Sequence, residues 1–281
     1  MKNTNFEESQ INLVKKEFSR ATAYASEYED KTPISHFFNA RIRRVAELLS
    51  DFEKGKVLDI GCGPSRIGQI FRGKTIEYYG VDVSDKMIKT AIEVFGNNAQ
   101  FHFALGNIEN LAFPEDSFDV VLCLGILEYV LDGNAAIREV QRVLKPNGVL
   151  IATMLNEWSP YRLWQTYGYW KFCSGARKLG RLMKTTKNGL KGVKPTELTK
   201  PQSVRYTEKT FRQLLTSAGL EIEDVMYYDF NLIPAPVDAK IPSISVFLSS
   251  NLEWLCRGKL RFLGTGLIAK GRKEFTSRLD H

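Results

Sequence analysis

The stretch Lys56-Val-Leu-Asp-Ile-Gly61-Cys-Gly63-Pro64 decides the fold of this chain. The apolar segment 56–60 is expected to form a short strand, and two glycines follow its end directly. Because glycine has no Cβ, Gly61 and Gly63 allow the backbone to turn sharply and to approach a ligand closely. The stretch therefore predicts a strand that ends at a ligand-binding turn.

Strands and helices alternate on the carboxyl side of this stretch. Further strands are expected at 77–83, 100–104, 118–124, 149–154, 221–229 and 265–273. Helices are expected near 66–72, 85–95, 135–144 and 207–218. The alternation indicates an α/β fold built from parallel strands with right-handed crossovers. Two helices, 7–30 and 34–50, are expected before the first strand, with Pro33 between them.

Composition and cysteine spacing indicate a globular protein of the reducing cytoplasm. The chain is 43% hydrophobic and 25% charged, which is ordinary for a globular domain. An uncharged apolar run of about 18 residues, as a membrane span needs, does not occur. The four cysteines are Cys62, Cys123, Cys173 and Cys256, and no two form a C-x-x-C pair. This spacing argues against a zinc site and against a disulfide framework.

The positive charge of the chain is concentrated in one segment. Residues 171–205 contain ten Lys or Arg and one acid, a net charge of +9 in a chain whose total is +7. A basic patch on a near-neutral body indicates one anion-facing surface rather than general nucleic-acid affinity. Two interpretations stay open for this segment: a solvated loop, or contact with an anionic membrane or a phosphorylated substrate.

An acid stands at the end of the second strand, 19 residues after Gly63. Asp82 in Tyr-Gly-Val-Asp-Val is placed to accept hydrogen bonds from both ribose hydroxyls of a nucleoside. The third glycine of a dinucleotide fingerprint would stand at position 66, which is Arg66. A pyrophosphate would be poorly held there, so the loop favours a nucleoside that carries an amino-acid tail.

These motifs resemble the class I S-adenosylmethionine-dependent methyltransferases over residues 40–156 and 206–273. The resemblance implies that the segment 59–63 surrounds the methionine part of the cofactor, Asp82 holds its ribose, and Val83 packs on its adenine. In the third-strand loop Asn107 replaces the usual Asp. The implied cofactor-binding residues are Asp59, Gly61, Cys62, Gly63, Asp82, Val83, Asn107, Ile108 and Leu124. Taken singly, Asp59 and Asp82 read as ordinary strand-end acids, and the ordered set favours cofactor binding.

The resemblance also implies the architecture. We expect a Rossmann-like three-layer sandwich around a seven-stranded, mostly parallel sheet of order 3-2-1-4-5-7-6, with the last strand antiparallel. One methyltransferase domain would span 1–281, and its parts are a helical cap (1–50), a cofactor-binding core (51–156), a lid insertion (157–205) and the C-terminal part of the core (206–273). A second insertion is expected at 231–262.

Three residues are candidates for catalysis. Where the family motif often has Glu-His, this chain has Glu128-Tyr129. Glu128 could orient the substrate or act as a base, or it could cap the following helix. Tyr129 replaces a histidine that could bind a metal, so no metal ion is expected. His36, in the cap, is favoured as a surface or structural histidine, and the alternative for it is a base.

Aromatic residues after the fifth strand are the candidates for substrate binding. Trp158, Tyr161 and Trp164 fall where related enzymes carry a lid, and they either pack as core or line an apolar pocket. Tyr24 and Tyr28 of the cap are expected to face the same substrate.

The expected reaction is methyl transfer from S-adenosylmethionine, leaving S-adenosylhomocysteine. The expected acceptor is an O, N or C nucleophile of a small, partly apolar metabolite, and the basic segment also admits an anionic or lipid-like one. The alternatives are an RNA methyltransferase and a non-catalytic protein that binds the cofactor. Neither an Asn-Pro-Pro-Tyr-like motif nor a Pro-Cys nucleophile follows the fourth strand, which argues against nucleic acid as the substrate.

Overall fold

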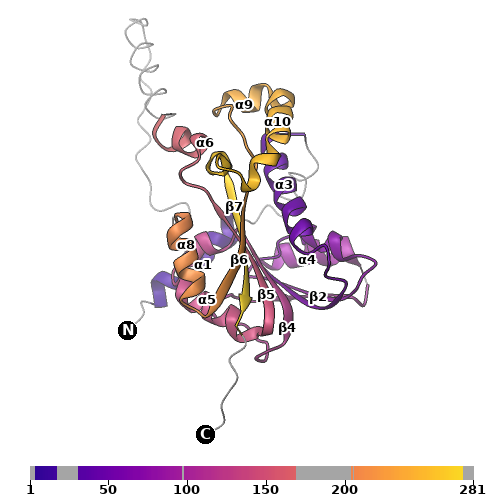
Figure 1. The fold of residues 1–281 in the computed structure, drawn as a ribbon. Coiled ribbons are helices and arrows are strands. Elements are labelled where there is room, and N and C mark those ends of the chain that lie inside the picture. The colour runs from indigo at the N-terminus through magenta and orange to yellow at the C-terminus, as the bar shows by residue number, and fades with distance from the viewer. Residues whose placement is uncertain (1–3, 18–30, 97, 169–203, 205, 275–281) are drawn as a thin grey trace, which may run out of the picture.

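A seven-stranded sheet of order β3-β2-β1-β4-β5-β7-β6 forms the centre of the computed structural model, which describes residues 4–17, 31–96, 98–168, 204 and 206–274 (Figure 1). Its strands are β1 (Lys54–Ile60), β2 (Thr75–Asp82), β3 (Phe101–Leu105), β4 (Phe118–Leu124), β5 (Leu144–Leu155), β6 (Leu220–Tyr228) and β7 (Gly266–Lys273). β7 is antiparallel to both of its neighbours, and the other pairs are parallel. The predicted strand order and the antiparallel last strand are confirmed.

Helices cover both faces of this sheet. They are α1 (Thr4–Glu17), α3 (Pro33–Leu48), α4 (Asp85–Phe95), α5 (Gly133–Val143), α6 (Pro160–Leu163), α8 (Glu208–Thr216), α9 (Val237–Lys240) and α10 (Pro242–Asn251). Shorter helical turns span Arg66–Phe71, Leu127–Tyr129, Trp164–Gly168, Glu253–Arg257 and Arg261–Leu263.

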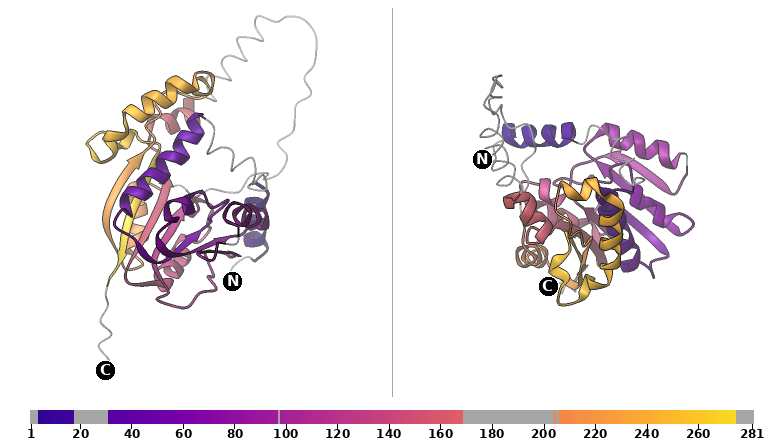
Figure 2. Two further views of the ribbon diagram at one scale, coloured as in Figure 1. Left: turned by 90° about the vertical axis from the view of Figure 1, so that its right-hand side faces the viewer. Right: turned by 90° about the horizontal axis from the view of Figure 1, so that it is seen from above.

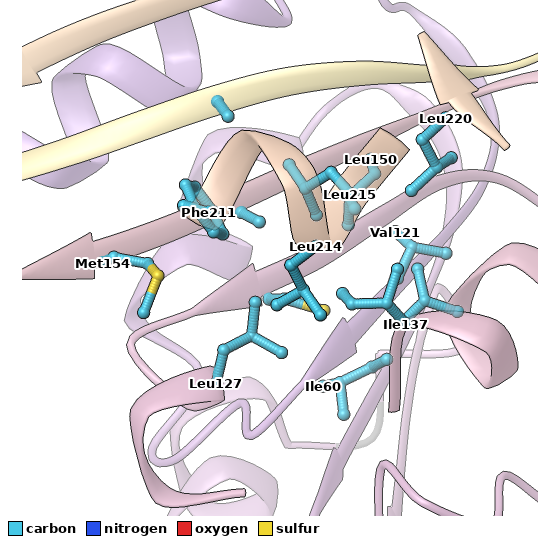
Figure 3. Close-up of a cluster of buried hydrophobic side chains, with 14 of the residues drawn as sticks. Ile60, Val121, Leu127, Ile137, Leu150, Met154, Phe211, Leu214, Leu215 and Leu220 are labelled. Carbon is cyan, nitrogen blue, oxygen red and sulfur yellow. The ribbon is translucent and has the colours of Figure 1, made fainter. Parts of the chain in front are cut away.

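Two hydrophobic clusters join the three layers. On one face, α4 and the turn at Arg66–Phe71 pack around the buried ring of Tyr78, while α3 packs against β6 and β7. On the other face, α5 and α8 bury an apolar stripe against β1, β4 and β5, with Ile137 and Phe211 among its fully buried members (Figure 3). The spacing of apolar residues along these helices, one face in each, explains why each helix covers the sheet.

Local capping fixes where the helices begin. The hydroxyl of Thr32 accepts a hydrogen bond from the Ser35 N–H at 3.2 Å, and Pro33 occupies the first turn of α3, where its missing N–H costs nothing. Ser84 and Asp132 cap α4 and α5 in the same way. Since Ser84 stands only two residues after the end of β2, α4 begins at the carboxyl edge of the sheet, where its N-terminal dipole faces the strand ends.

The structure differs from the sequence expectation at two places. The expected helix at 66–72 is a 3-10 turn. The strand expected at 149–154 begins earlier, since β5 starts at Leu144: Leu144 pairs with Phe118 and Val149 with Val120, so four residues bulge out opposite Asp119. Lys145 stabilises this bulge through an ion pair with the Asp119 carboxylate at 2.8 Å. Of the expected helix 7–30, the structure describes the part up to residue 17, and this part is helical.

The insertions lie at one edge of the sheet. β5 and β6 are both antiparallel to β7, so their carboxyl ends meet at the edge where β1, β2 and β4 also end. α6 follows β5, while α9 and α10 follow β6, and Figures 1 and 2 show these helices together beyond that edge. In the part of the chain that the structure describes, none of the helices has both the length and the apolar character of a membrane span.

Truncation of Phe211 tests the packing of α8 on the sheet. Its ring is fully buried, so Phe211→Ala should lower the free energy of unfolding by about 3–5 kcal/mol, through lost apolar burial and the cavity left behind. Phe247→Ala is the matched control, because the ring of Phe247 is exposed. Urea titration followed by circular dichroism measures both, and equal stabilities of the two variants would contradict this account of the core.

Candidate functional site

A cavity opens at the carboxyl edge of the sheet, where β1, β2 and β4 end. Its walls come from the turn after β1, the end of β2, the loop after β3, the end of β4, and one side each of α1 and α3. All nine residues predicted to hold the cofactor line it: Asp59, Gly61, Cys62, Gly63, Asp82, Val83, Asn107, Ile108 and Leu124. Strand ends that are distant in the sequence meet here because parallel strands end at a common edge.

The turn after β1 depends on glycine. Gly61 has φ = +69°, and a Cβ built on it would lie 2.1 Å from Cγ2 of Ile126. The N–H groups of Gly61 and Cys62 both donate to the carbonyl oxygen of Val81, at 2.8 and 3.0 Å. The turn is therefore fastened to β2, and it forms a wall that a side chain at position 61 would disrupt.

The carboxylate of Asp82 is held in place by backbone donors. The N–H of Gly63 donates to Oδ2 at 3.0 Å, and the N–H of Ser84 donates to Oδ1 at 2.8 Å. Burial raises the pKa of Asp82, and these backbone N–H groups oppose the shift. A carboxylate offers about four lone-pair sites, so each oxygen keeps capacity to accept a further hydrogen bond from a ligand hydroxyl.

Asp59 is the buried acid of the cavity wall. The Tyr78 hydroxyl donates to Oδ2 of Asp59 and itself accepts from the Ser65 hydroxyl at 2.8 Å. Burial raises the pKa of Asp59 to about 7, against the opposing effects of the Tyr78 hydrogen bond and the Arg41 charge. Asp59 is thus fixed in position by Tyr78, a residue that the sequence motif does not include.

Arg41, which sequence reasoning missed, places a buried positive charge in the cavity wall. It comes from α3, is buried, and lines the cavity. Its guanidinium donates to the carbonyl oxygen of Leu124 at 3.4 Å and lies 5.2 Å from the ring centre of Phe38. A signal existed in the sequence: Arg41 stands on the apolar stripe of its helix, three residues after Phe38 and four before Val45.

Glu128 lies near Arg41 in the turn Leu127–Tyr129 after β4, behind the residues that line the cavity. Burial raises the pKa of Glu128, and the charges of Arg41 and Arg162 oppose this. Its Oε2 atom is buried without a hydrogen-bond partner among the described residues. A Cβ at the cavity-lining Gly125 would lie 2.7 Å from Nη1 of Arg41 and 4.0 Å from Oε1 of Glu128, so both charged groups flank this glycine. Asp132, and not Glu128, caps α5, which removes the helix-cap interpretation of Glu128.

Tyr129 and the loop after β3 complete the wall. Tyr129 lines the cavity, and its carbonyl oxygen accepts from the Gln10 side-chain amide at 3.4 Å. The Asn107 side-chain oxygen accepts from the N–H of Glu109 at 3.2 Å and retains a second lone pair. Gln10, Ile11 and Val14 of α1 cover the cavity, a role that sequence reasoning did not assign to them.

His36 does not line this cavity. Its Nδ1 lies 2.8 Å from Oδ1 of Asp229, and its Nε2 lies 3.0 Å from the Ser250 hydroxyl. Both ring nitrogens are engaged, one with Asp229 after β6 and the other with Ser250 of α10. The placement contradicts the expectation of a base at this site and supports the structural interpretation of His36.

None of the described aromatic residues of the expected lid lines the cavity, and two of them, Tyr161 and Trp164, are hydrogen-bonded to the second insertion. The Tyr161 hydroxyl donates to Asp238 at 2.6 Å, and the Trp164 indole N–H donates to the Ala235 carbonyl oxygen at 2.7 Å. Trp158 is 63% exposed. A second hollow, lined by Tyr161 and Arg162, lies between these residues and the start of α3. Tyr24, Tyr28 and the basic segment up to residue 203 lie outside the described residues.

A family model described as a methyltransferase domain matches residues 58–152. The ubiquinone biosynthesis O-methyltransferase of Xanthomonas oryzae pv. oryzae is 28% identical over 160 residues, which are 55% of this chain and 66% of that protein. The protein of the same name from Xanthomonas euvesicatoria pv. vesicatoria is 26% identical over 230 residues, 79% of this chain and 87% of its own length. The matched segment thus spans slightly less than two thirds of the first relative and most of the second.

Solved structures with the same fold cover most of the chain. An S-adenosylmethionine-dependent methyltransferase from Thermotoga maritima superposes with a TM-score of 0.59 at 17% identity, over 92% of this chain and 97% of that one. One from Mesorhizobium loti gives 0.54 at 18% identity, over 82% and 96% of the two chains. These identities are low, so the likeness establishes the fold.

The raised pKa of Asp59 predicts how stability depends on pH. Its ordinary value is 3.8 and its value in the fold is about 7, so the folded state holds this proton more tightly than the unfolded chain. Stability from this group is complete below about pH 4 and is lost as the pH rises through about 7. Asp59→Asn removes the ionisation and should flatten the pH dependence of the free energy of unfolding across this window. Denaturant titrations between pH 4 and 8 measure the slope.

The exposed Asp85 provides the control for this experiment. Asp85→Asn should keep the slope of the unaltered protein, because this carboxylate is exposed on α4. An unchanged slope in Asp59→Asn would show that burial of Asp59 does not govern the titration.

Proposed function

This chain belongs to the class I S-adenosylmethionine-dependent methyltransferases, and we propose that it transfers a methyl group to a small, partly apolar metabolite. The observation that carries the proposal is the fixed Asp82 carboxylate beside the Gly61 turn. Backbone donors at 3.0 and 2.8 Å preorganise this acid, so binding two ribose hydroxyls needs no rearrangement of the carboxylate.

The residues of the cavity suit the cofactor part by part. Asp82 would accept from the ribose hydroxyls, Val83 and Ile108 would pack on the adenine, and the spare lone pair of Asn107 would accept from its amino group. The turn at Gly61 leaves room for the methionine tail. When bound, S-adenosylmethionine supplies an electrophilic methyl group on a positively charged sulfur. The protein then has to orient the acceptor, exclude water and take up the proton that the acceptor loses on methylation.

We propose that the acceptor carries a hydroxyl group on a small aromatic or apolar body. The relatives named ubiquinone biosynthesis O-methyltransferases support an oxygen nucleophile. The cavity walls beyond the nucleoside residues are largely apolar, with Ile11, Val14 and Ile42 from the two covering helices. A small apolar body would bury surface against these side chains.

Glu128 is the group that we propose to receive the proton of that hydroxyl. It is buried, its pKa is raised, and its Oε2 atom has no hydrogen-bond partner among the described residues. Arg41 beside it would stabilise the carboxylate form before the proton arrives. A raised pKa makes Glu128 a stronger base than an exposed glutamate.

Removing the Asp82 carboxylate should weaken cofactor binding. Asp82→Ala loses charge-assisted hydrogen bonds to the ribose, so the binding free energy for S-adenosylmethionine should fall by about 1.5–3 kcal/mol. Asp85→Ala, an exposed acid three residues away, should bind as the unaltered protein does. Isothermal titration calorimetry measures both, and equal affinities would remove the basis of the proposed site.

Replacing Glu128 should affect turnover and leave cofactor affinity unchanged. Glu128→Gln keeps the shape of the side chain and removes the base, so kcat with a panel of hydroxylated aromatic acceptors should fall roughly 10²–10⁴-fold. Because the pKa of Glu128 is raised, activity of the unaltered enzyme should increase as the pH rises through it. The variant should lack this rise. A variant with unchanged kcat and the same pH profile would exclude Glu128 as the base.

A further inference from the structure

Helix α10 exposes apolar side chains and buries polar ones. Ser245 and Ser249 are 1% and 2% exposed, whereas Ile244 and Phe247 are 54% and 66% exposed. The helix of a soluble protein normally shows the opposite arrangement, because burial of apolar surface drives its packing. The orientation of α10 therefore needs a separate cause.

Hydrogen bonds to the serines supply that cause. The Ser245 hydroxyl donates to the Asn231 side chain at 3.0 Å, and the Ser249 hydroxyl donates to the Asp229 carboxylate at 3.2 Å. The Ser250 hydroxyl lies 3.0 Å from the His36 ring. These buried contacts fix the rotation of α10 about its axis, and the fixed rotation turns the apolar face outward.

The exposed face extends beyond α10 into a larger surface. Exposed apolar side chains continue from α9 through α10 into the turn at Glu253–Arg257. We call this the insertion surface, and it comprises Val237, Ile241, Ile244, Phe247, Leu248 and Trp254. Ile244 and Leu248 are four residues apart on α10, so they share one side of that helix. Exposed apolar patches of this kind mark sites of interaction with a partner or a membrane.

The exposed charged side chains within the segment 230–264 have one sign. The segment 230–264 contains two acids, Asp238 and Glu253, and neither is exposed. Asp238 accepts from the Tyr161 hydroxyl, and Glu253 is paired with Arg44 at 2.7 Å. Lys240 and Lys259 are exposed and take part in none of the ion pairs found among the described residues. The surface is thus apolar with a cationic margin.

We propose that the insertion surface docks on an anionic lipid bilayer. Apolar side chains with Trp at the margin insert at the boundary between headgroups and acyl chains, and lysines contact anionic headgroups. A second copy of this chain fits less well. A two-fold contact through the same surface would bring cationic margins together without an exposed acid to pair with them.

The insertion surface lies at the same edge of the sheet as the cavity. The chain leaves β6 into α9 and α10 and returns into β7, at the edge where β1, β2 and β4 end. Docking would hold this edge near the bilayer, from which an apolar acceptor reaches the enzyme. This last consequence rests on the proposed function, whereas docking itself does not.

Co-sedimentation with vesicles tests the proposal on the full chain. Vesicles of phosphatidylcholine with 30% phosphatidylglycerol (about a third anionic, chosen to give a clear surface potential) are compared with phosphatidylcholine alone. We expect binding to the anionic vesicles that weakens with added salt. The double variant Ile244→Ser/Phe247→Ser should lose at least about tenfold in vesicle affinity, and Lys240→Ser/Lys259→Ser should lose the preference for anionic vesicles.

The control variant is Ile92→Ser, which removes an exposed apolar side chain from α4, outside the insertion surface. It should bind vesicles as the unaltered protein does. S-adenosylmethionine affinity, measured in the same samples, should be unchanged in every variant, which separates this proposal from the cofactor site. Absence of vesicle binding by the unaltered chain, or binding that survives Ile244→Ser/Phe247→Ser, would overturn the proposal. So would a dimer in analytical ultracentrifugation that this double variant converts to a monomer.

Discussion

The buried carboxylate of Asp229 is the point at which separate parts of the chain are fastened together. Oδ1 lies 2.8 Å from His36 of α3 and accepts from the Ser249 hydroxyl of α10, while the Thr265 hydroxyl before β7 donates to Oδ2. The backbone N–H of Asp229 donates to Glu253 at 3.0 Å. Burying a carboxylate costs free energy unless hydrogen bonds replace those it made to water. The hydrogen bonds of Asp229 come from a helix, an insertion and the start of a strand, so they hold these three segments together.

The cofactor cavity depends indirectly on this arrangement. With His36 held against Asp229, α3 lies across the sheet edge and carries Arg41 to the cavity. The positive charge of Arg41 acts on two buried acids: it lowers the pKa of both Asp59 and Glu128, against the effect of burial. A second cation, Arg162, acts on Glu128 in the same direction.

In the two insertions, aromatic side chains form hydrogen bonds through their polar atoms, and α10 buries serines while it exposes apolar side chains. Tyr161 and Trp164, which read as pocket-lining aromatics, use their polar atoms to hold Asp238 and the Ala235 carbonyl. The serines of α10 hold Asn231 and Asp229, while its isoleucine and phenylalanine face outward. These hydrogen bonds are directional, so they give the exposed apolar surface of α10 a defined orientation.

The sequence by itself determined the parts of this protein whose physical basis is local. Strand and helix periodicity fixed the order of elements, and the steric demands of a tight turn at Gly61 and the strand-end position of Asp82 located the cofactor cavity. Resemblance to a known family then supplied the sheet order. Tertiary structure alone decided the contributions of Arg41, His36 and Trp164. Their partners lie between 71 and 193 residues away in the sequence, and a charged or aromatic side chain reads the same in a core, at a surface or in a site. The tertiary structure also decided which side of α10 faces outward. That orientation depends on hydrogen bonds to Asn231 and Asp229, and the spacing of residues within the helix does not predict them.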